Sequence, residues 1–277
     1  MPEGPEIRRA ADRVEKALKD ELIQAVDLLH PALVGHEPLF ISHFVTRIDT
    51  RGKAMLIRLS SGWTVYSHNQ LYGRWTVNPV SAIAASNRVL RLAITTNSHT
   101  ARLWSATDIN FFRSGEESSH PFIASLGPDV LNPESTPSIL LDRLVSTSCR
   151  GRKAASLMLD QQAFAGLGNY LRSEILFVAG VHPDDRPMDL DQGRLEQWAT
   201  NISRLSLRTY RTGGVTVDKN MADAGKASGR RRETWRHYVF NREGLDCPIC
   251  SSTIVRKRYG GRRLDFCPKC QTPKRHL

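Results

Sequence analysis

Hydrophobic and polar positions follow two different periods along this chain. Residues 6–19 place apolar side chains three and four positions apart, with charged side chains on the opposite face, which predicts an amphipathic helix near the amino terminus. From Leu39 to about Trp104, short stretches rich in β-branched and aromatic residues favour strands instead. We expect strands over 54–59, 63–67 and 89–94, with Ser60-Ser61-Gly62 as a hairpin turn, in a β-rich domain that ends near Leu126.

After Gly127-Pro128 the period becomes helical. Apolar residues recur at helical spacing over 138–145, 154–161, 170–178 and 194–207, which predicts a compact helical domain. Gly166 and Gly168 separate the second of these helices from the third, and Gly180 ends the third. Residues 212–229 contain four glycines and few apolar anchors, so we expect a linker or a mobile loop there.

Charge is concentrated at the carboxyl-terminal end. The chain has 277 residues and a formal charge of +11, and residues 226–277 contain 14 Lys and Arg against 4 Asp and Glu. This tail alone carries +10 of the total. Clustered basic side chains gain free energy by displacing counterions from phosphates, so the pattern predicts an anionic partner such as nucleic acid.

The amino terminus lacks the basic and apolar segments of a secretory signal, and no apolar run approaches the roughly 18 residues that cross a bilayer. We therefore expect a cytoplasmic protein with no membrane association. Four of the five cysteines fall in the last 31 residues, which favours a metal site over a disulfide framework.

The cysteine spacing predicts a structural zinc site. Cys247 and Cys250 are separated from Cys267 and Cys270 by sixteen residues, the spacing of a four-cysteine zinc ribbon. A set of four thiolates leaves no coordination position open, so one structural zinc ion is expected. The residues between the two pairs, 256–263, form a basic stretch with two central glycines, which is either a phosphate-binding hairpin or a solvated charged turn.

Pro2 and Glu3 are a candidate nucleophile and acid. If an aminopeptidase removes Met1, Pro2 becomes a free secondary amine, which can form only a charged iminium with an aldehydic carbon. A helix that begins beside the amine disfavours its cation, and Glu3 is placed to deliver a proton to a sugar oxygen. Taken alone, Pro2 is better explained as a residue that begins a helix, and further residues are needed to favour the nucleophile.

These residues resemble the motifs of a known protein family. The opening M-P-E-G-P-E-I is similar to the amino terminus of the Fpg/Nei family of DNA glycosylases, and the likeness extends over nearly the whole chain. Further matching segments in family order are Thr50-Arg51-Gly52-Lys53, Ser67-His68-Asn69-Gln70-Leu71-Tyr72-Gly73, Gly127-Pro128-Asp129-Val130-Leu131, Gly166-Leu167-Gly168-Asn169-Tyr170-Leu171 and the cysteine ribbon.

The resemblance implies an α+β fold. It comprises an N-terminal β-sandwich domain with an N-terminal helix, and a C-terminal helix-two-turn-helix domain ending in a four-cysteine zinc ribbon. The corresponding boundaries are 1–126 for the catalytic β-rich domain, 127–212 for the helical DNA-binding domain, 213–244 for a linker and basic segment, and 245–277 for the ribbon.

The resemblance also implies roles for individual residues. Pro2 would attack C1′ of the damaged nucleotide, and Glu3 would protonate the sugar. Lys53 would bind phosphate and donate a proton near the lesion, while Arg262 would bind the adjacent phosphate and assist the second elimination. Because Arg263 is the next residue, the assignment to Arg262 depends on the alignment register.

The resemblance also implies that two further segments bind DNA. Gln70, Leu71 and Tyr72 resemble the wedge that fills the space left by an extruded base, although an ordinary apolar strand end would also explain them. Asn169 begins a helix after a glycine turn, where backbone amides and its side chain can hold phosphate.

Within the family the wedge and the Gly168-Asn169-Tyr170-Leu171 motif resemble the endonuclease VIII branch. This predicts a monomeric, bifunctional glycosylase and AP lyase that removes oxidised pyrimidines from double-stranded DNA without a small-molecule cofactor. The alternatives are activity on oxidised purines and a non-catalytic zinc-ribbon DNA-binding protein. One departure is Ser125, which stands where near relatives have an arginine, so one DNA contact is either lost or supplied by Arg113.

Overall fold

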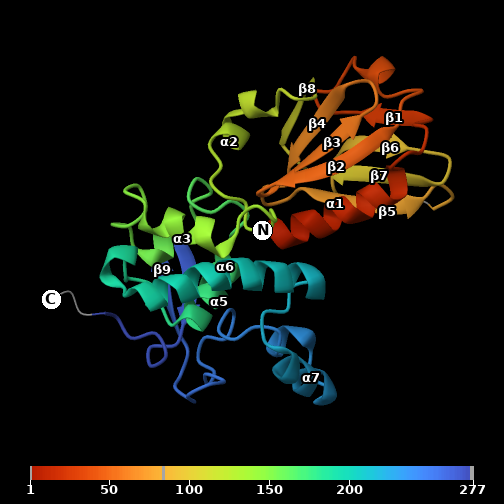
Figure 1. The fold of residues 1–277 in the computed structure, drawn as a ribbon. Helices are drawn as coiled ribbons and strands as arrows, with labels where there is room; N and C mark the ends of the chain where they lie inside the picture. Colours follow the sequence, from red (N-terminus) through yellow and green to blue (C-terminus); the bar gives the residue numbers. More distant parts are fainter. Residues whose placement is uncertain (1, 83–84, 275–277) are drawn as a thin grey trace. The chain divides into compact units, whose positions relative to one another are not determined.

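The computed structural model describes residues 2–82 and 85–274. Its backbone contacts divide the chain into two compact units, Met1–Ser125 and Leu126–Leu277 (Figure 1). Among the described residues, no helix combines the length and apolar character that crossing a membrane requires.

Unit 1 begins with the predicted amphipathic helix, α1 (Gly4–Leu18). Its apolar face is buried in the core of the unit at Ile7, Ala11, Val14 and Leu18. The helix starts immediately after Pro2 and Glu3 because proline at position 5 suits the first turn and Glu3 acts as the N-cap residue. The two candidate catalytic residues therefore lie at the positive end of the helix dipole.

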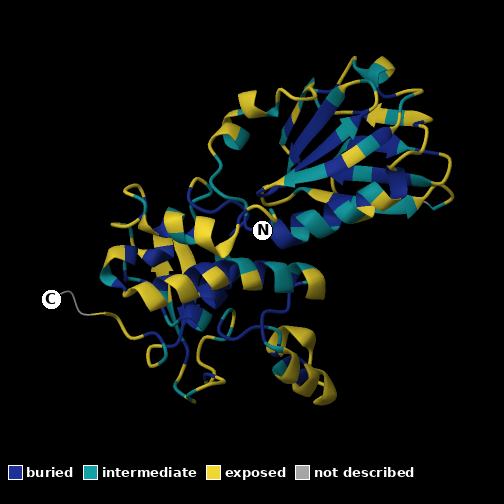
Figure 2. Ribbon diagram, viewed as in Figure 1, coloured by how far each residue is buried: buried dark blue, intermediate teal, exposed yellow. Residues whose placement is uncertain are grey.

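Two four-stranded antiparallel sheets form the rest of the core of unit 1. Their strand orders are β1-β6-β7-β5 and β2-β3-β4-β8. The strands are β1 (Ala25–Leu28), β2 (Val45–Arg51), β3 (Ala54–Leu59), β4 (Trp63–His68), β5 (Arg74–Pro79), β6 (Leu90–Thr95), β7 (His99–Trp104) and β8 (Asp108–Arg113). Apolar side chains from both sheets belong to one buried cluster, so the sheets form the expected β-sandwich. Figure 2 shows the buried stretches of the strands in dark blue. Strands β1 and β8 extend the β-rich region beyond the predicted limits of 39 and 104.

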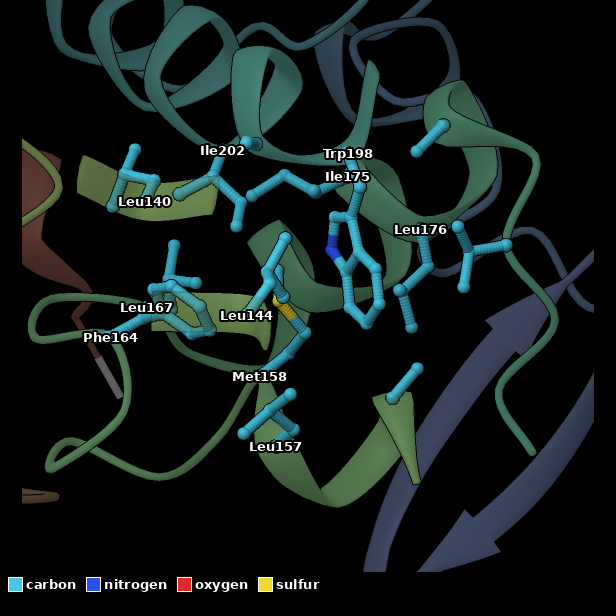
Figure 3. Packing of buried hydrophobic residues seen from close by; sticks show 14 of the residues in the cluster. Leu140, Leu144, Leu157, Met158, Phe164, Leu167, Ile175, Leu176, Trp198 and Ile202 are labelled. Atoms are coloured by element: carbon cyan, nitrogen blue, oxygen red, sulfur yellow. The ribbon is translucent and has the colours of Figure 1, made fainter. Parts of the chain in front are cut away.

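Unit 2 is mainly helical. Its principal helices are α3 (Pro137–Val145), α5 (Asn169–Ala179) and α6 (Gln192–Thr212), and they surround a buried cluster that includes Leu144, Ile175 and Trp198 (Figure 3). Short helical turns complete the two units: η1 (Glu37–Leu39), η2 (Glu117–Ser119), α2 (Pro121–Ala124), η3 (Pro187–Asp189) and η4 (Arg232–Thr234).

Two predictions for unit 2 are wrong. The helix expected over 154–161 is only one turn, α4 (Ala154–Leu157), because the Asp160 carboxylate accepts the backbone N–H of Gln162 at 2.9 Å and favours a turn. The segment expected to be a linker or mobile loop contains helix α7 (Lys219–Ala227), which Asp218 caps by accepting the N–H of Met221 at 2.9 Å.

The ribbon follows as a hairpin of β9 (Val255–Tyr259) and β10 (Arg262–Phe266). Leu264 and Phe266 of β10 join the helical core, while Trp235 and Tyr238 share a second buried cluster with Cys247 and Cys267. These aromatic residues therefore help to pack the ribbon onto the helical part of unit 2.

Candidate functional site

The amino-terminal part of the site lies beside a cavity of about 470 Å³ in unit 1. Pro2 lines this cavity together with residues of α1, of the β4–β5 connection and of β5, namely Glu6, Ile7, Ala10, Arg13, Asn69, Gly73, Arg74, Trp75, Thr76, Val77 and Asn78. Met1 lies outside the described residues. The cavity brings the candidate nucleophile next to the two ends of the candidate wedge loop, Asn69 and Gly73.

Glu3 is held in a fixed position although it is the second residue after the initiator. It is only 3% exposed, and its backbone N–H donates to Oε2 of Glu6 at 3.0 Å in a reciprocal capping box. A carboxyl group buried directly beside Pro2 is suitably placed to exchange a proton with a substrate held at the amine.

The candidate wedge is a tight loop with exposed apolar side chains. Leu71 and Tyr72 are 62% and 70% exposed, although both are large and apolar. The loop closes where the N–H of Gly73 donates to the carbonyl of Asn69 at 2.7 Å, and a Cβ at Gly73 would lie 2.6 Å from that same oxygen. Only glycine fits here, so the loop presents Leu71 and Tyr72 to solvent on a rigid base.

Gln70 is oriented by its neighbours. Its backbone has a φ of +46°, its N–H donates to Nδ1 of His68 at 3.1 Å, and its Oε1 accepts from the hydroxyl of Thr107 at 2.9 Å. With Oε1 engaged in this way, the Nε2 hydrogens are the group that the side chain offers outward.

Lys53 lies at the turn between β2 and β3 and is only 6% exposed. Its neighbour Ala54 pairs with His68 across the β3–β4 ladder. Burial and the positive charge of Lys53 lower the pKa of His68, which is consistent with a neutral ring whose Nδ1 accepts from Gln70. His68 was not among the predicted site residues, and the signal that could have identified it is its place in the segment 67–73, two residues before the wedge.

In unit 2 Asn169 is the first residue of α5, preceded by Gly166 at φ +98° and the N-cap residue Gly168. Its Oδ1 accepts from Nη2 of Arg172 at 2.6 Å, which turns the amide hydrogens away from this contact. Arg172 is fully buried and also donates to the carbonyl of Arg263 at 2.7 Å. One guanidinium thus joins the start of α5 to the basic hairpin of the ribbon.

Arg262 and Arg263 follow the turn of the hairpin and have different surroundings. Gly260 and Gly261, with φ values of +56° and +76°, form the two-residue turn, and Arg262 pairs directly with Tyr259. Both arginines are exposed, but the guanidinium of Arg263 lies 5.1 Å above the ring of Phe240, whereas Arg262 lies directly beside the turn. The basic stretch is therefore a hairpin, as expected, with different surroundings for its two neighbouring arginines.

The four cysteines gather at the other end of the ribbon. The Sγ atoms of Cys247, Cys250, Cys267 and Cys270 all lie within 4.8 Å of one another. Two of the separations are 3.4 and 3.8 Å, near the ~3.8 Å that follows for a tetrahedral ion with Zn–S distances of about 2.3 Å. The donor set and its geometry fit a metal ion.

Buried polar side chains hold the ribbon to the helices, and the sequence reasoning missed them. The carboxylate of Glu174 in α5 accepts the N–H groups of Tyr238, Val239 and Phe240 at 2.7 to 2.8 Å, and also the hydroxyl of Thr216. Gln271 joins Cys267 to the carbonyl of Val181. The available signal was an arginine and a glutamate inside the largely apolar segment of α5.

Comparison with known proteins identifies the family. The profile of the formamidopyrimidine-DNA glycosylase N-terminal domain matches residues 1–110, and that of the formamidopyrimidine-DNA glycosylase H2TH domain matches residues 126–220. The chain belongs to the formamidopyrimidine-DNA glycosylase family. It is accordingly a bifunctional DNA glycosylase and AP lyase of base excision repair.

Relatives agree with this membership, and a solved structure shares the fold. Endonuclease 8 of Escherichia coli O17:K52:H18 is 41% identical over 98% of this chain and 100% of its own length, and that of Shigella flexneri is 40% identical over the same shares. The fold matches Lactococcus lactis formamidopyrimidine-DNA glycosylase bound to DNA with an AP site, with a TM-score of 0.79, 18% identity, and coverage of 98% of this chain and 99% of that one. The resemblance to the endonuclease VIII branch is thereby confirmed.

Proposed function

We propose that this glycosylase removes oxidised pyrimidines from double-stranded DNA through a Schiff base on Pro2. The observation that carries the proposal is the position of Pro2, at the start of α1 and in one cavity with the ends of the wedge loop. A base extruded past Leu71 and Tyr72 would bring its sugar toward the same cavity. The 41% identity to endonuclease 8 over the full length of that relative favours the pyrimidine branch.

The chemistry begins at the sugar. After removal of Met1, the secondary amine of Pro2 attacks C1′ while the glycosidic bond breaks and the damaged base departs. Glu3 protonates the ring oxygen, the ring opens, and a charged iminium joins the enzyme to C1′. The positive end of α1 favours the neutral, nucleophilic form of the amine before the attack.

Two eliminations then cut the strand. Loss of a proton from C2′ expels the 3′ phosphate, and loss of a proton from C4′ expels the 5′ phosphate; hydrolysis of the remaining imine frees Pro2. Lys53 would bind phosphate and donate a proton near the lesion, and Arg262 would bind the adjacent phosphate during the second elimination. Asn169, at the start of α5, would hold phosphate with its amide and the helix N-terminus.

We assign zinc to the four cysteines in a structural role. Cys247, Cys250, Cys267 and Cys270 would hold one ion that fixes the base of the hairpin, and the ion supplies no chemistry to the reaction. The enzyme is proposed to act as a monomer, with the predicted domains 1–126, 127–212, 213–244 and 245–277, in the bacterial cytoplasm.

Borohydride trapping tests the proposal. The protein is incubated with duplexes that carry dihydrouracil or 8-oxoguanine, the imine is reduced, and mass spectrometry locates the adduct. We expect an adduct on Pro2 with the dihydrouracil duplex, and Pro2→Ala should keep DNA binding but lose base excision and strand cleavage. Trapping on 8-oxoguanine alone would move the substrate to oxidised purines. Binding without any adduct would identify a non-catalytic DNA-binding protein.

Glu3→Gln separates the acid from the nucleophile. This variant should lose about 10²-fold or more in base excision, since positioned proton transfer contributes on that scale. It should still cleave a preformed abasic site through Pro2, where no base has to leave. Equal loss on both substrates would contradict the role given to Glu3.

A further inference from the structure

The basic hairpin is attached to the helical part of unit 2 at a residue that faces Arg262. Tyr259 is the last residue of β9 and pairs directly with Arg262 at the start of β10. Only Gly260 and Gly261 lie between them, and glycines restrict the backbone least. The position of Arg262 therefore depends on what holds Tyr259.

Tyr259 is held by a carboxylate far away in the sequence. Its hydroxyl donates to Oδ2 of Asp184 at 3.0 Å, and Asp184 lies in the segment that follows α5. The other carboxylate oxygen, Oδ1, accepts from Nζ of Lys153 at 2.7 Å. Each oxygen of Asp184 thus has its own donor, which fixes the orientation of the carboxylate.

The ring and the opposite strand complete the attachment. The half-buried ring of Tyr259 packs against the helical core of unit 2. On the opposite strand, the carbonyl of Arg263 accepts from the buried Arg172. The hairpin is therefore fastened on both strands, with Arg262 between the two attachment points.

We propose that the hydrogen bond from Tyr259 to Asp184 positions Arg262 for the second elimination. This inference rests on the role that the proposed function gives to Arg262. Tyr259 and Asp184 act through Arg262 and are positioning residues. When the bond is lost, the glycine turn lets the tip of the hairpin move, and a displacement of about 1 Å at a reacting group can cost as much as about 100-fold in rate.

Tyr259→Phe tests the inference because it removes only the hydroxyl and keeps the ring in place. On a duplex with a preformed abasic site, we expect the second elimination to slow by about tenfold while the first elimination and Pro2 trapping stay near the wild-type rates. The control is Tyr238→Phe, which removes another tyrosine-to-aspartate hydrogen bond of unit 2, to the carboxylate of Asp218, together with the bond that the Asp218 N–H donates to the same hydroxyl. This control should leave the ratio of the two elimination products unchanged.

A second variant and a double variant test the inference without relying on Tyr259→Phe alone. Asp184→Ala removes the same bond from the other side and should shift the product ratio in the same direction. Tyr259→Phe combined with Arg262→Ala should give the ratio of Arg262→Ala alone, since positioning has no effect once the positioned group is gone. Additive effects in the double variant would overturn the inference.

The outcomes also separate this inference from the proposed function. The wild-type protein could form the reduced adduct on Pro2, and Arg262→Ala could change the ratio of the two elimination products. If Tyr259→Phe then leaves that ratio unchanged, only the positioning role of Tyr259 is wrong. If Tyr259→Phe lowers both eliminations and thermal stability together, the bond is merely structural, which again overturns it. If the wild-type protein forms no adduct, the proposed function fails and this inference fails with it.

Discussion

The two units hold their candidate site residues in different ways. In unit 1 the contacts are mostly local: Glu3 is fixed by Glu6, and the wedge loop is closed between Asn69 and Gly73, although Gln70 also accepts from the more distant Thr107. In unit 2 they are distant in sequence, since Arg172 reaches a carbonyl 91 residues away. We infer that substitutions at the site of unit 1 change activity with little effect on stability. Substitutions of the buried residues that support the site of unit 2 should change both activity and stability.

The largest expected effect comes from the cysteine cluster. Cys267→Ser should lose most of the bound metal and unfold the ribbon, because zinc contributes about 10 to 16 kcal/mol to the folding of comparable small sites. Elemental analysis would measure the metal and identify it. Hydrogen exchange should show loss of protection in the hairpin β9–β10 and unchanged protection in the sheets of unit 1.

Cys149→Ser is the matched control for this experiment. Cys149 is a fully buried thiol in the helical core and is not part of the cysteine cluster. It should leave the metal content unchanged. A full complement of metal in Cys267→Ser would show that the four cysteines are not the ligands.

The next effect concerns the buried carboxylate of α5. Glu174→Ala would leave three backbone N–H groups without their acceptor, so we expect a loss of about 3 to 5 kcal/mol in the free energy of unfolding. Urea denaturation would measure it. The exposed Glu196 of α6 offers the control, since Glu196→Ala should change stability by less than about 0.5 kcal/mol. A loss below about 1 kcal/mol in Glu174→Ala would contradict the contrast between the units.

The same contrast explains how much of the molecule the sequence could predict. Helix α1, the hairpin turn at residues 60–62 and the cysteine cluster each depend on neighbouring residues or fixed spacings, and all three were predicted. The residue motifs also led to the right family. No local sequence pattern indicates that Arg172 and Glu174 form hydrogen bonds with residues 64 to 91 positions away. These bonds exist only after the ribbon and the segment before it have packed on α5.

The failure at α7 has a related cause. Residues 212–229 have few apolar side chains of their own, which suggested a loop. The helix is stabilised from outside the segment by Trp235, whose ring lies so close to Gly225 that a Cβ there would be 2.5 Å from it. A glycine that weakens a helix in isolation here permits its packing.

A smaller effect is expected at the wedge, and it should fall on activity alone. Leu71→Ala and Tyr72→Ala should each slow base excision on a fully paired duplex by about tenfold, because filling the vacated space offsets part of the few kcal/mol that extruding a base costs. Melting temperatures should not change, since both side chains are exposed. Excision from an unpaired bubble should be affected less.

Leu29→Ala is the control for the wedge. Leu29 is also exposed, at 56%, and belongs to unit 1, but it lies outside the wedge loop. It should keep the wild-type rate on both substrates. If the wedge variants lost equal activity on the duplex and the bubble, their contribution would be something other than base extrusion.

The smallest effect is a dependence of stability on pH in unit 2. Burial, helped by Arg236 and Arg232, lowers the pKa of His237 to about 3, whereas in the unfolded chain it titrates near 6.5. Only the unfolded state binds this proton between these values, so stability is complete above about pH 6.5 and falls as the pH decreases toward 3. The expected loss is up to about 1.4 kcal/mol per pH unit.

Urea denaturation at pH 7 and pH 5.5 would measure this loss. His237→Gln should show a smaller decrease than the wild type, by about 1 kcal/mol, because glutamine has no proton to bind. Burial also lowers the pKa values of His30 and His68 in unit 1, so some dependence should remain in the variant. An identical decrease in both proteins would show that the pH dependence arises from groups other than His237. It would also remove one reason for expecting that changes in the buried network of unit 2 affect stability more than changes at the site of unit 1.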